Sequence, residues 1–267
     1  MNAATALDAA RMLWRCVREG RVIDSLPDAL RPADIVQGQA IQAQLPVASG
    51  FGVVGWKIAA TSEAGQRHIN VGAPLPGRIL SGLVVEAGST VSLAGNRMRV
   101  AEPEFAFRFG HTLSPRAALY AQQEVLDAVA SLHPALEVPD SRYAAFTRAG
   151  EAQLIADNAC CGRFAFGDAA PPRWREIDLS AHAVRGTVTN SAGHARYTRV
   201  GHGRAALGDP RTALVWLVNQ LSALGLSIDA GQVVSTGTCM VPLAIEPGDL
   251  VRADFGDLGT VSLRFAT

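Results

Sequence analysis

Residues 99–110 read Arg99-Val100-Ala101-Glu102-Pro103-Glu104-Phe105-Ala106-Phe107-Arg108-Phe109-Gly110. The three phenylalanines fall on one face of an extended chain and the two glutamates on the other, because successive strand residues point to opposite faces. This alternation predicts a β-strand with an apolar face and an acidic start. Pro103 has no backbone N–H donor, so we expect this strand to lie at a sheet edge or to carry a bulge.

The flanking sequence predicts an α+β protein that is rich in β-structure and begins with helices. Apolar residues recur at helical spacing from Leu7 to Val17, and Gly20 stands where a helix C-terminal cap belongs. The further predicted elements are helices over 35–45 (ended by Pro46), from Ser114 to Leu132 and over 210–225, strands over 51–58 and 233–236, and a hairpin of strands 250–255 and 260–265. We therefore expect a helical N-terminal segment at 1–50 and a β-rich catalytic domain at 51–267.

The composition excludes several kinds of protein. The 267 residues include 24 Lys+Arg and 24 Asp+Glu, so the formal net charge is zero and no basic stripe is available for nucleic acid. With 48% apolar residues, the chain can bury a large core. Charged residues interrupt the first thirty positions too often for a signal peptide or a membrane span. We expect a cytoplasmic protein with no nucleic-acid or membrane partner.

The two glutamates of residues 99–110 are the most informative pair in the sequence. On a strand, Glu102 and Glu104 project to the same face, where their charges repel unless a cation or a proton lies between them. A divalent metal ion would meet this need. The alternative is an exposed strand edge with two ordinary solvated glutamates, since Glu-x-Glu is a common pattern.

A third acid, Glu137, lies between Leu136 and Val138 in a segment apolar enough to be a buried strand. An unpaired carboxylate would be costly there, so Glu137 needs a partner. Three carboxylates without a nearby histidine or cysteine favour a hard ion, Mg²⁺ or Mn²⁺. Lys57, a lone lysine in the apolar run 55–59, either extends to the surface or faces these acids.

Five motifs stand in order along residues 35–267. They are Gly55-Trp56-Lys57-Ile58-Ala59-Ala60-Thr61-Ser62, Glu102-Pro103-Glu104-Phe105-Ala106-Phe107, Ala135-Leu136-Glu137-Val138 with Asp140-Ser141-Arg142, Ala156-Asp157-Asn158-Ala159, and Pro247-Gly248-Asp249. Together they resemble the fumarylacetoacetate hydrolase superfamily, and within it the branch of 2-hydroxypenta-2,4-dienoate (2-keto-4-pentenoate) hydratases and 4-oxalocrotonate decarboxylases. The resemblance implies a rolled, mixed β-sheet and a homo-oligomer.

The resemblance also implies roles for individual residues. Glu102, Glu104 and Glu137 match the family's three metal carboxylates, usually on Mg²⁺ or Mn²⁺. Lys57 matches the active-site lysine of the family. Thr238, after a glycine, falls where the family tends to place a hydroxyl near the ligand, and is therefore a candidate for substrate binding.

Four other positions bear on the reaction. Arg142 offers two parallel hydrogen bonds to a substrate carboxylate, or it braces its own loop beside Asp140. Leu75 stands where many hydratases of this branch have an acid, and Cys160 stands where some members have serine. The carbon–carbon hydrolases of the superfamily typically use a His–Glu pair in the N-terminal region, whereas the first histidine here is His68.

These observations predict a metal-dependent lyase that acts on a small anionic 2-oxo or 2-hydroxydienoic acid. The expected reaction is hydration of a 2-hydroxy-2,4-dienoate to a 4-hydroxy-2-oxo acid, with the metal ion binding the substrate oxygens and Lys57 moving a proton. The alternatives are decarboxylation of a 4-oxalocrotonate-type acid, acylpyruvate-type hydrolysis of a carbon–carbon bond, and a non-catalytic binding protein that keeps the fold. The missing acid at Leu75 leaves hydration and decarboxylation both open.

Overall fold

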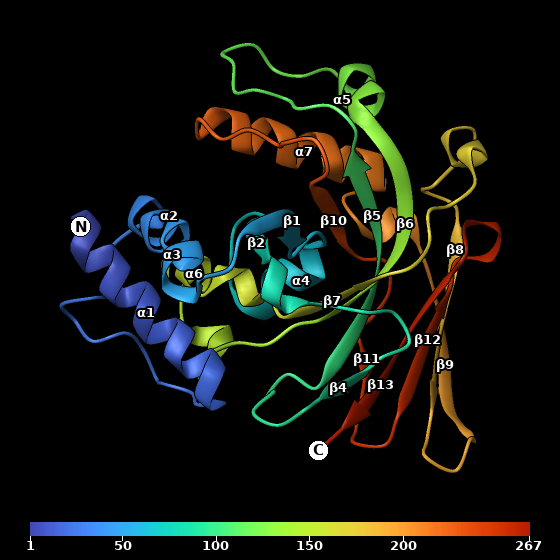
Figure 1. Cartoon of the computed structure of the whole chain (residues 1–267), viewed down its shortest axis with the longest axis horizontal. Coiled ribbons are helices and arrows are strands. Elements are labelled where there is room, and N and C mark those ends of the chain that lie inside the picture. The colour runs from blue at the N-terminus through green and yellow to red at the C-terminus, as the bar shows by residue number, and fades with distance from the viewer.

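The computed structural model describes all 267 residues, which form N-terminal helices and two β-sheets (Figure 1). The helices are α1 (Ala3–Glu19), α2 (Ile35–Ala43), α3 (Leu45–Ser49), α4 (Glu63–Ile69), α5 (Gln122–Ala128), α6 (Glu151–Ala156) and α7 (Pro210–Ala223). The strands are β1 (Val53–Ala59), β2 (Leu75–Leu80), β3 (Val84–Val85), β4 (Thr90–Ser92), β5 (Val100–Phe109), β6 (Val129–Val138), β7 (Arg163–Phe166), β8 (Ala183–Thr189), β9 (Ala195–His202), β10 (Val233–Thr238), β11 (Leu243–Ala244), β12 (Leu250–Asp254) and β13 (Thr260–Ala266). No helix has both the length and the apolar character that crossing a membrane requires.

The two sheets are mixed. The larger has eight strands in the order β2-β1-β10-β5-β6-β7-β3, with β11 pairing beside the start of β5. The smaller has the order β4-β13-β12-β8-β9. Each sheet contains parallel and antiparallel pairs, and the strands curl around the interior in Figure 1. The rolled mixed sheet of an α+β protein, predicted from the sequence, is thereby confirmed.

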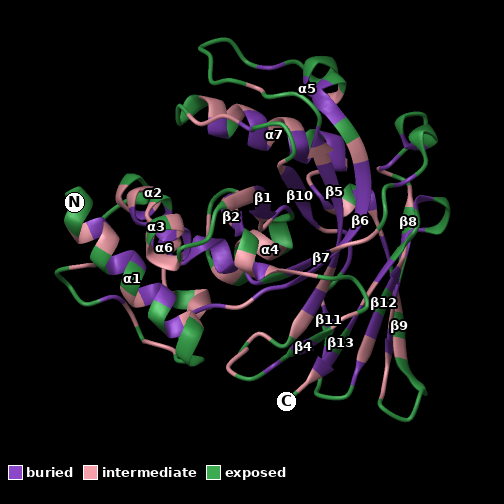
Figure 2. Ribbon diagram, viewed as in Figure 1, coloured by how far each residue is buried: buried purple, intermediate pink, exposed green.

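Strand β5 lies in the middle of the larger sheet, antiparallel to both β10 and β6. Its three phenylalanines are buried in the main apolar core, to which α7 also contributes side chains. Figure 2 shows much of β5 in the colour of buried residues. The alternation of residues 99–110 therefore predicted both the strand and its buried face. The opposite face of β5, which carries the glutamates, is free to form a site.

The N-terminal segment is helical, as predicted. Asn2 begins α1 by accepting a hydrogen bond from the backbone N–H of Thr5 (2.9 Å), and Gly20 ends it in a left-handed conformation (φ 61°). Leu13 of α1 shares a second apolar core with Phe164 of β7 and neighbouring side chains. This shared core anchors the N-terminal helices on the larger sheet; the division of the chain at residue 50 remains a prediction.

The expected edge position of Pro103 is wrong, because β5 has a neighbour on each side. The Pro103 carbonyl accepts a hydrogen bond from the Cys239 N–H (2.9 Å), and the N–H and C=O of one strand residue point to the same side. The side of Pro103 that lacks an N–H therefore faces residues 239–242, which lie between the end of β10 and the start of β11. The expected irregular pairing occurs in two places, between Ser235 and Thr238 on the β10 side and between Arg108 and Phe109 on the β6 side.

The helix predicted from Ser114 to Leu132 is also wrong. Only α5 is helical in this region, and β6 begins at Val129. Val129 pairs with Phe109 and Leu132 with Phe107 across the β5–β6 ladder. Pairing with a buried strand thus prevails over the local preference for helix, which is a weak determinant in the tertiary context.

The remaining predicted elements agree with the structure apart from their boundaries. Strands β12 and β13 form the predicted hairpin, and α7 begins at the predicted Asp209-Pro210 pair. The helix expected over 35–45 ends at Ala43, and Pro46 opens the short α3 instead of terminating α2. Proline is well suited to a first helical turn, because the N–H that it lacks has no helical partner there.

Candidate metal centre and active site

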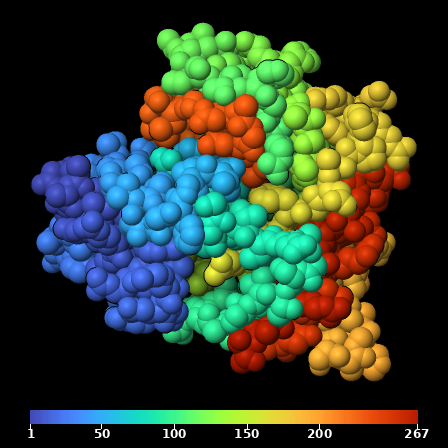
Figure 3. Space-filling model, viewed as in Figure 1, coloured from blue at the N-terminus to red at the C-terminus, as the bar shows by residue number.

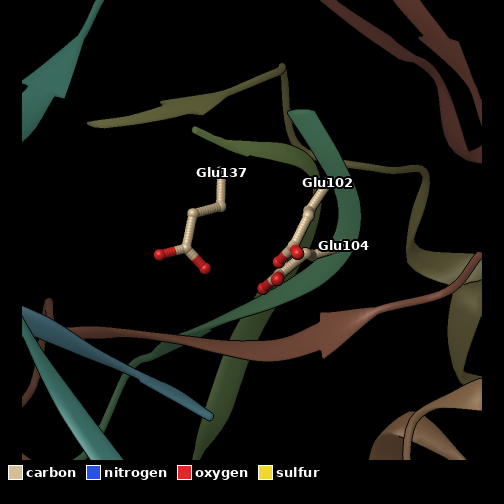
Figure 4. A group of neighbouring side chains, drawn as sticks. All are labelled: Glu102, Glu104 and Glu137. Atoms are coloured by element: carbon tan, nitrogen blue, oxygen red, sulfur yellow. The ribbon is translucent and has the colours of Figure 1, made fainter. Parts of the chain in front are cut away.

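Three glutamates converge where β5 pairs with β6. In the antiparallel register Glu102 lies directly opposite Glu137, and Glu104 follows two residues along β5 on the same face. One carboxylate oxygen of each residue lies within 4.8 Å of the other two. Figure 4 shows the side chains of Glu102 and Glu104 next to each other, with their carboxylates turned toward that of Glu137. We call these residues the glutamate triad.

Burial makes this concentration of charge costly. Glu104 and Glu137 are 0% exposed, whereas Glu102 is half-buried. Burial and the charge of Glu137 raise the pKa of Glu102 to about 7. Burial, with the charges of the other two acids, holds the pKa of Glu104 well above its usual value, and burial also raises the pKa of Glu137. The three carboxylates therefore need a cation if they are to be ionised together.

Hydrogen bonds hold Glu104 and Glu137 but leave one oxygen of Glu104 free. Ser235 Oγ (2.5 Å) and the Gly237 N–H (3.1 Å) both donate to Glu104 Oε2, and the Gly162 N–H donates to Glu137 Oε1 (3.3 Å). Glu104 Oε1 is buried without a hydrogen-bond partner. An unpartnered carboxylate oxygen beside two further carboxylates fits a hard divalent cation, which takes oxygen ligands.

Lys57 lies against the same carboxylates. Its Nζ is 3.1 Å from Glu137 Oε2, and it donates to the backbone carbonyl of Ala159 at 3.1 Å. The side chain is only 3% exposed. Burial alone would lower the pKa of Lys57, but the charges of the triad raise it above its ordinary value. The site therefore holds a buried, charged ammonium group in contact with the triad.

Lys57 is also the only lysine in the chain, so the 24 Lys+Arg residues comprise one lysine and 23 arginines. A sequence that uses arginine at every other basic position keeps lysine at the one that contacts the triad. The two side chains are not interchangeable, because an ammonium is compact and can release a proton, whereas a guanidinium is planar and stays charged. The presence of a single lysine among the basic residues is thus a feature of the sequence that could have identified Lys57 as a site residue.

Thr238 and Arg142, the two residues predicted to bind substrate, lie in different surroundings. Thr238 pairs with Glu104 between β10 and β5, and its hydroxyl donates to the Met240 carbonyl (2.9 Å). Arg142 is buried, and its guanidinium contacts Asp157 rather than the triad. Thr238 is therefore next to the triad, whereas Arg142 belongs to an ion pair that braces its own loop.

The residues that bear on the choice of reaction also have defined positions. Leu75 and Cys160, where the sequence departs from the hydratase pattern, are buried together in a small apolar cluster that includes Ala159. His68 is exposed on α4, where its ring contacts Phe146 edge-on. His68 is not part of the triad.

Four groups at the site were not predicted from the sequence, among them the Gly237 N–H that donates to Glu104. The Ser235 hydroxyl holds Glu104, and backbone groups of Gly162 and Ala159 hold Glu137 and Lys57. The polar run Ser235-Thr236 next to Val233-Val234 could have pointed to the first, because a hydroxyl on a buried strand needs a partner. Backbone groups have no such signature in residue type, so their roles appear only in the folded chain.

Comparison with known proteins places this geometry in a family context. The family described as fumarylacetoacetate (FAA) hydrolase C-terminal matches residues 81–266. The 2-keto-4-pentenoate hydratase of Paraburkholderia xenovorans is 31% identical over 261 residues, which is 97% of this chain and 94% of that protein. The 2-keto-4-pentenoate hydratase 1 of Dechloromonas aromatica is 32% identical, over 97% of this chain and 96% of that protein.

A second activity occurs among the similar proteins. A 4-oxalocrotonate decarboxylase of a Pseudomonas species is 30% identical over 88% of this chain and 87% of its own length. The solved structure of 4-oxalocrotonate decarboxylase from Pseudomonas putida G7, complexed with magnesium and adipate, superimposes with a TM-score of 0.85 at 25% identity, covering 99% of this chain and 98% of that one. The fold is therefore shared across the whole chain.

Proposed function

Because the chain belongs to the fumarylacetoacetate hydrolase family, we propose that it is a divalent-metal-dependent lyase that hydrates a 2-hydroxy-2,4-dienoate to a 4-hydroxy-2-oxo acid. The observation that carries this proposal is the convergence of the glutamate triad and Lys57 in one buried site. The relatives named as 2-keto-4-pentenoate hydratases, which match nearly the full length of the chain, support the same reaction.

Glu102, Glu104 and Glu137 would hold Mg²⁺, or Mn²⁺ in its place. When bound, the divalent cation supplies a Lewis acid that polarises the 2-oxo group of the substrate. If all three carboxylates were ionised, the triad and the ammonium of Lys57 would sum to −2, which repels an anionic acid, and a divalent cation would bring this sum to zero. The charge of the site therefore couples substrate binding to occupation of the triad.

Lys57 would move the proton that the reaction requires. Water adds its hydroxyl at C4 and a proton at C5, and the proton of the 2-hydroxyl moves to C3 as the 2-oxo group forms. A group that donates and accepts protons must therefore reach the carbon chain. Lys57 Nζ is the basic group in contact with the triad, and Glu137 and the Ala159 carbonyl fix its direction. Thr238, beside Glu104, is a candidate to bind a polar group of the substrate.

Arg142 has less support as a direct ligand of the substrate. Its guanidinium is buried against Asp157 and also donates to the Cys161 carbonyl (3.4 Å). A contact with a substrate carboxylate would require this ion pair to open, and an unpaired buried Asp157 would be costly. The contacts of Arg142 favour the bracing role.

Decarboxylation of a 4-oxalocrotonate-type acid is the second candidate, and a specific observation favours it. Leu75, in place of the acid of many hydratases, is buried in an apolar cluster beside the carbonyl that holds Lys57. Loss of CO₂ needs the same charge stabilisation as hydration but no activated water. The 4-oxalocrotonate decarboxylases among the similar proteins are consistent with this candidate.

The test is to identify the product with each substrate. Purified protein with Mg²⁺ is mixed with 2-hydroxypenta-2,4-dienoate or with 4-oxalocrotonate, and the loss of diene absorbance and the product mass are recorded. We expect the first substrate to gain one water. Release of CO₂ from the second substrate without hydration of the first would favour decarboxylation. No turnover with Mg²⁺ or Mn²⁺, together with unchanged ligand binding in a Glu104→Gln variant, would contradict both candidates.

A further inference from the structure

Three consecutive residues beside Lys57 have a backbone conformation that ordinary residues rarely adopt. Asn158 (φ 58°), Ala159 (φ 53°) and Cys160 (φ 58°) are all left-handed. Asparagine tolerates this region, but alanine and cysteine do so only when their surroundings hold them there. We call these residues the left-handed turn. Strain of this kind persists where contacts over-determine the backbone, so the contacts around the turn are informative.

The turn is anchored at its start by Asp157. One carboxylate oxygen, Asp157 Oδ2, accepts hydrogen bonds from Ser141 Oγ (2.7 Å) and from the Arg142 N–H (3.0 Å), and the Arg142 guanidinium contacts the other oxygen. At the end of the turn, the Cys160 carbonyl accepts a hydrogen bond from the Asp140 N–H (3.1 Å). The loop that follows β6 thus holds both ends of the turn.

The Asn158 side chain attaches the turn to β2. Its Oδ1 accepts a hydrogen bond from the Arg78 N–H (2.7 Å), and its Nδ2 donates to the Arg78 carbonyl (2.8 Å). Strand β2 is the last strand on this side of the larger sheet. The amide of Asn158 therefore takes the place of a next strand at Arg78, and only a side chain with both a donor and an acceptor can do this.

Gly77 lets the turn approach β2 closely. A Cβ atom at Gly77 would lie 2.6 Å from the Asn158 carbonyl oxygen and 3.0 Å from both Cγ and Cδ of Lys57. The hydrocarbon stem of Lys57 and the turn therefore both lie against the bare backbone of this glycine. A displacement of the turn would change the surroundings of the stem as well as those of the ammonium group.

The other side of the turn is not fully packed. A cavity of about 110 Å³ between α1 and the segment around β4 is lined in part by Asp157, Asn158 and Cys161. Figure 3 shows a hollow between the N-terminal helices, coloured blue, and the teal segment that precedes β5. Apolar packing on this side is therefore incomplete, and the hydrogen bonds of Asp157 and Asn158 must hold the turn.

We propose that Asn158 is a positioning residue that acts on Lys57 through the left-handed turn. By clamping the turn to β2, it fixes the Ala159 carbonyl 3.1 Å from Lys57 Nζ. The same segment continues to Gly162, whose N–H holds Glu137, the other partner of the ammonium. The hydrogen bonds of Asn158 to Arg78 therefore fix the positions of both groups that direct Lys57 toward the substrate. The catalytic consequence rests on the proposed function, whereas the effect on the position of Lys57 does not.

The kinetic test compares Asn158→Gly with a matched control. Glycine adopts the left-handed conformation readily but lacks the amide that hydrogen-bonds to Arg78. We expect kcat for the dienoate to fall about tenfold to a hundredfold, because small displacements of a reacting group are costly, while KM and Mg²⁺ affinity stay within about twofold. The control is Gln42→Ala, which removes another buried amide that joins β2 to α6, through the carbonyls of Pro76 and Ile155 (2.8 and 3.2 Å). The control should lose stability but keep kcat.

A second measurement observes Lys57 without turnover. Because it is the only lysine, labelling the lysine Nζ with ¹⁵N gives a single side-chain signal from the whole chain. We expect this signal to shift or broaden in Asn158→Gly and to stay unchanged in Gln42→Ala. A wild-type signal and wild-type kcat in Asn158→Gly would overturn the proposal.

Two further outcomes distinguish a failure of the proposed function from a failure of the proposed role of Asn158. If the wild-type protein hydrates and decarboxylates nothing, the proposed function fails, but the lysine signal still decides whether Asn158 positions Lys57. If Asn158→Gly does not fold, Asn158→Asp is measured in its place. Aspartate keeps the acceptor for the Arg78 N–H, loses the donor to the Arg78 carbonyl and adds a negative charge, so the lysine signal should change. An unchanged lysine signal in Asn158→Asp would then overturn the proposal.

Discussion

At the scale of single residues, the site depends on a few charged side chains whose burial costs free energy. Glu104 and Glu137 are fully buried acids, and Lys57 is a buried base in contact with one of them. Removing one partner from such a set leaves an uncompensated charge, so each member depends on the others. The retention of one lysine among 23 arginines indicates that this position needs an ammonium group rather than just a positive charge.

This requirement predicts the behaviour of a Lys57→Arg variant. Arginine keeps the charge beside Glu137 but does not release a proton at ordinary pH. We expect kcat to fall by about two to four orders of magnitude, the usual contribution of a positioned proton donor. Steady-state kinetics with the dienoate would measure the loss, and circular dichroism would confirm that the variant is folded. Activity near that of the wild type would show that Lys57 does not move a proton.

A second prediction concerns Ser235, which donates to Glu104 at 2.5 Å. The Ser235→Ala variant leaves the carboxylate in place but removes the hydrogen bond that orients it. Loss of such a supporting contact typically weakens metal affinity about tenfold to a hundredfold. Isothermal titration with Mn²⁺ would check this value. Thr187→Ala, which removes a half-buried hydroxyl on β8, is the control and should bind the ion like the wild type.

The raised pKa of Glu102, about 7, predicts how metal binding depends on pH. The pKa of Glu102 in the folded protein lies above its value of about 4.5 in the unfolded chain. The protonated acid therefore stabilises the fold below pH 4.5, and this contribution is lost as pH rises through 7. Metal ions compete with this proton. We expect the increase in Tm caused by Mg²⁺ to be larger at pH 7.5 than at pH 5.5, as measured by calorimetry. An equal increase at both values would contradict protonation of the triad.

At the scale of elements, the pairing of β5 with β6 builds the site. The Glu-x-Glu spacing predicted that Glu102 and Glu104 share a face, but the position of Glu137 opposite Glu102 follows from a register between strands that are far apart in sequence. The same non-local pairing made the helix from Ser114 to Leu132 a wrong prediction. Local patterns therefore predicted the acidic strand, while contacts formed only by the sheet determined what lies beside it.

The close contact between β2 and the left-handed turn yields a prediction about Gly77. Its replacement by alanine would place a Cβ 2.6 Å from the Asn158 carbonyl oxygen, so the turn or β2 must move. We expect Gly77→Ala to lower kcat about tenfold or more and to reduce Tm by several degrees. Gly72→Ala is the matched control, because a Cβ there meets nothing within 4 Å. Equal kcat in both variants would show that the close contact does not matter for Lys57.

At the scale of the whole molecule, a neutral chain contains a strongly unbalanced site. The formal net charge is zero, yet three acids share one buried position with a single base. The overall neutrality therefore conceals a local charge suited to a cation and a small acid. The N-terminal helices share a core with the larger sheet and line the cavity behind the left-handed turn, so they support the site from outside the strands.

The sequence predicted much of this organisation and left the rest open for physical reasons. The rolled mixed sheet and the family followed from motifs along residues 35–267, and comparison with known proteins confirms both. The role of the Ala159 carbonyl and the bracing of Arg142 by Asp157 depend on backbone geometry that residue types do not reveal. The homo-oligomer that the resemblance implies stays a prediction.

We expect Glu102, Glu104 and Glu137 together to hold one divalent cation. The most direct measurement is an anomalous difference map from crystals soaked in Mn²⁺, because manganese scatters anomalously and shares the oxygen preference of Mg²⁺. We predict one strong peak within coordination distance of a carboxylate oxygen from each of the three residues. A peak elsewhere, or no peak at a Mn²⁺ concentration that supports turnover, would show that the triad does not hold the ion.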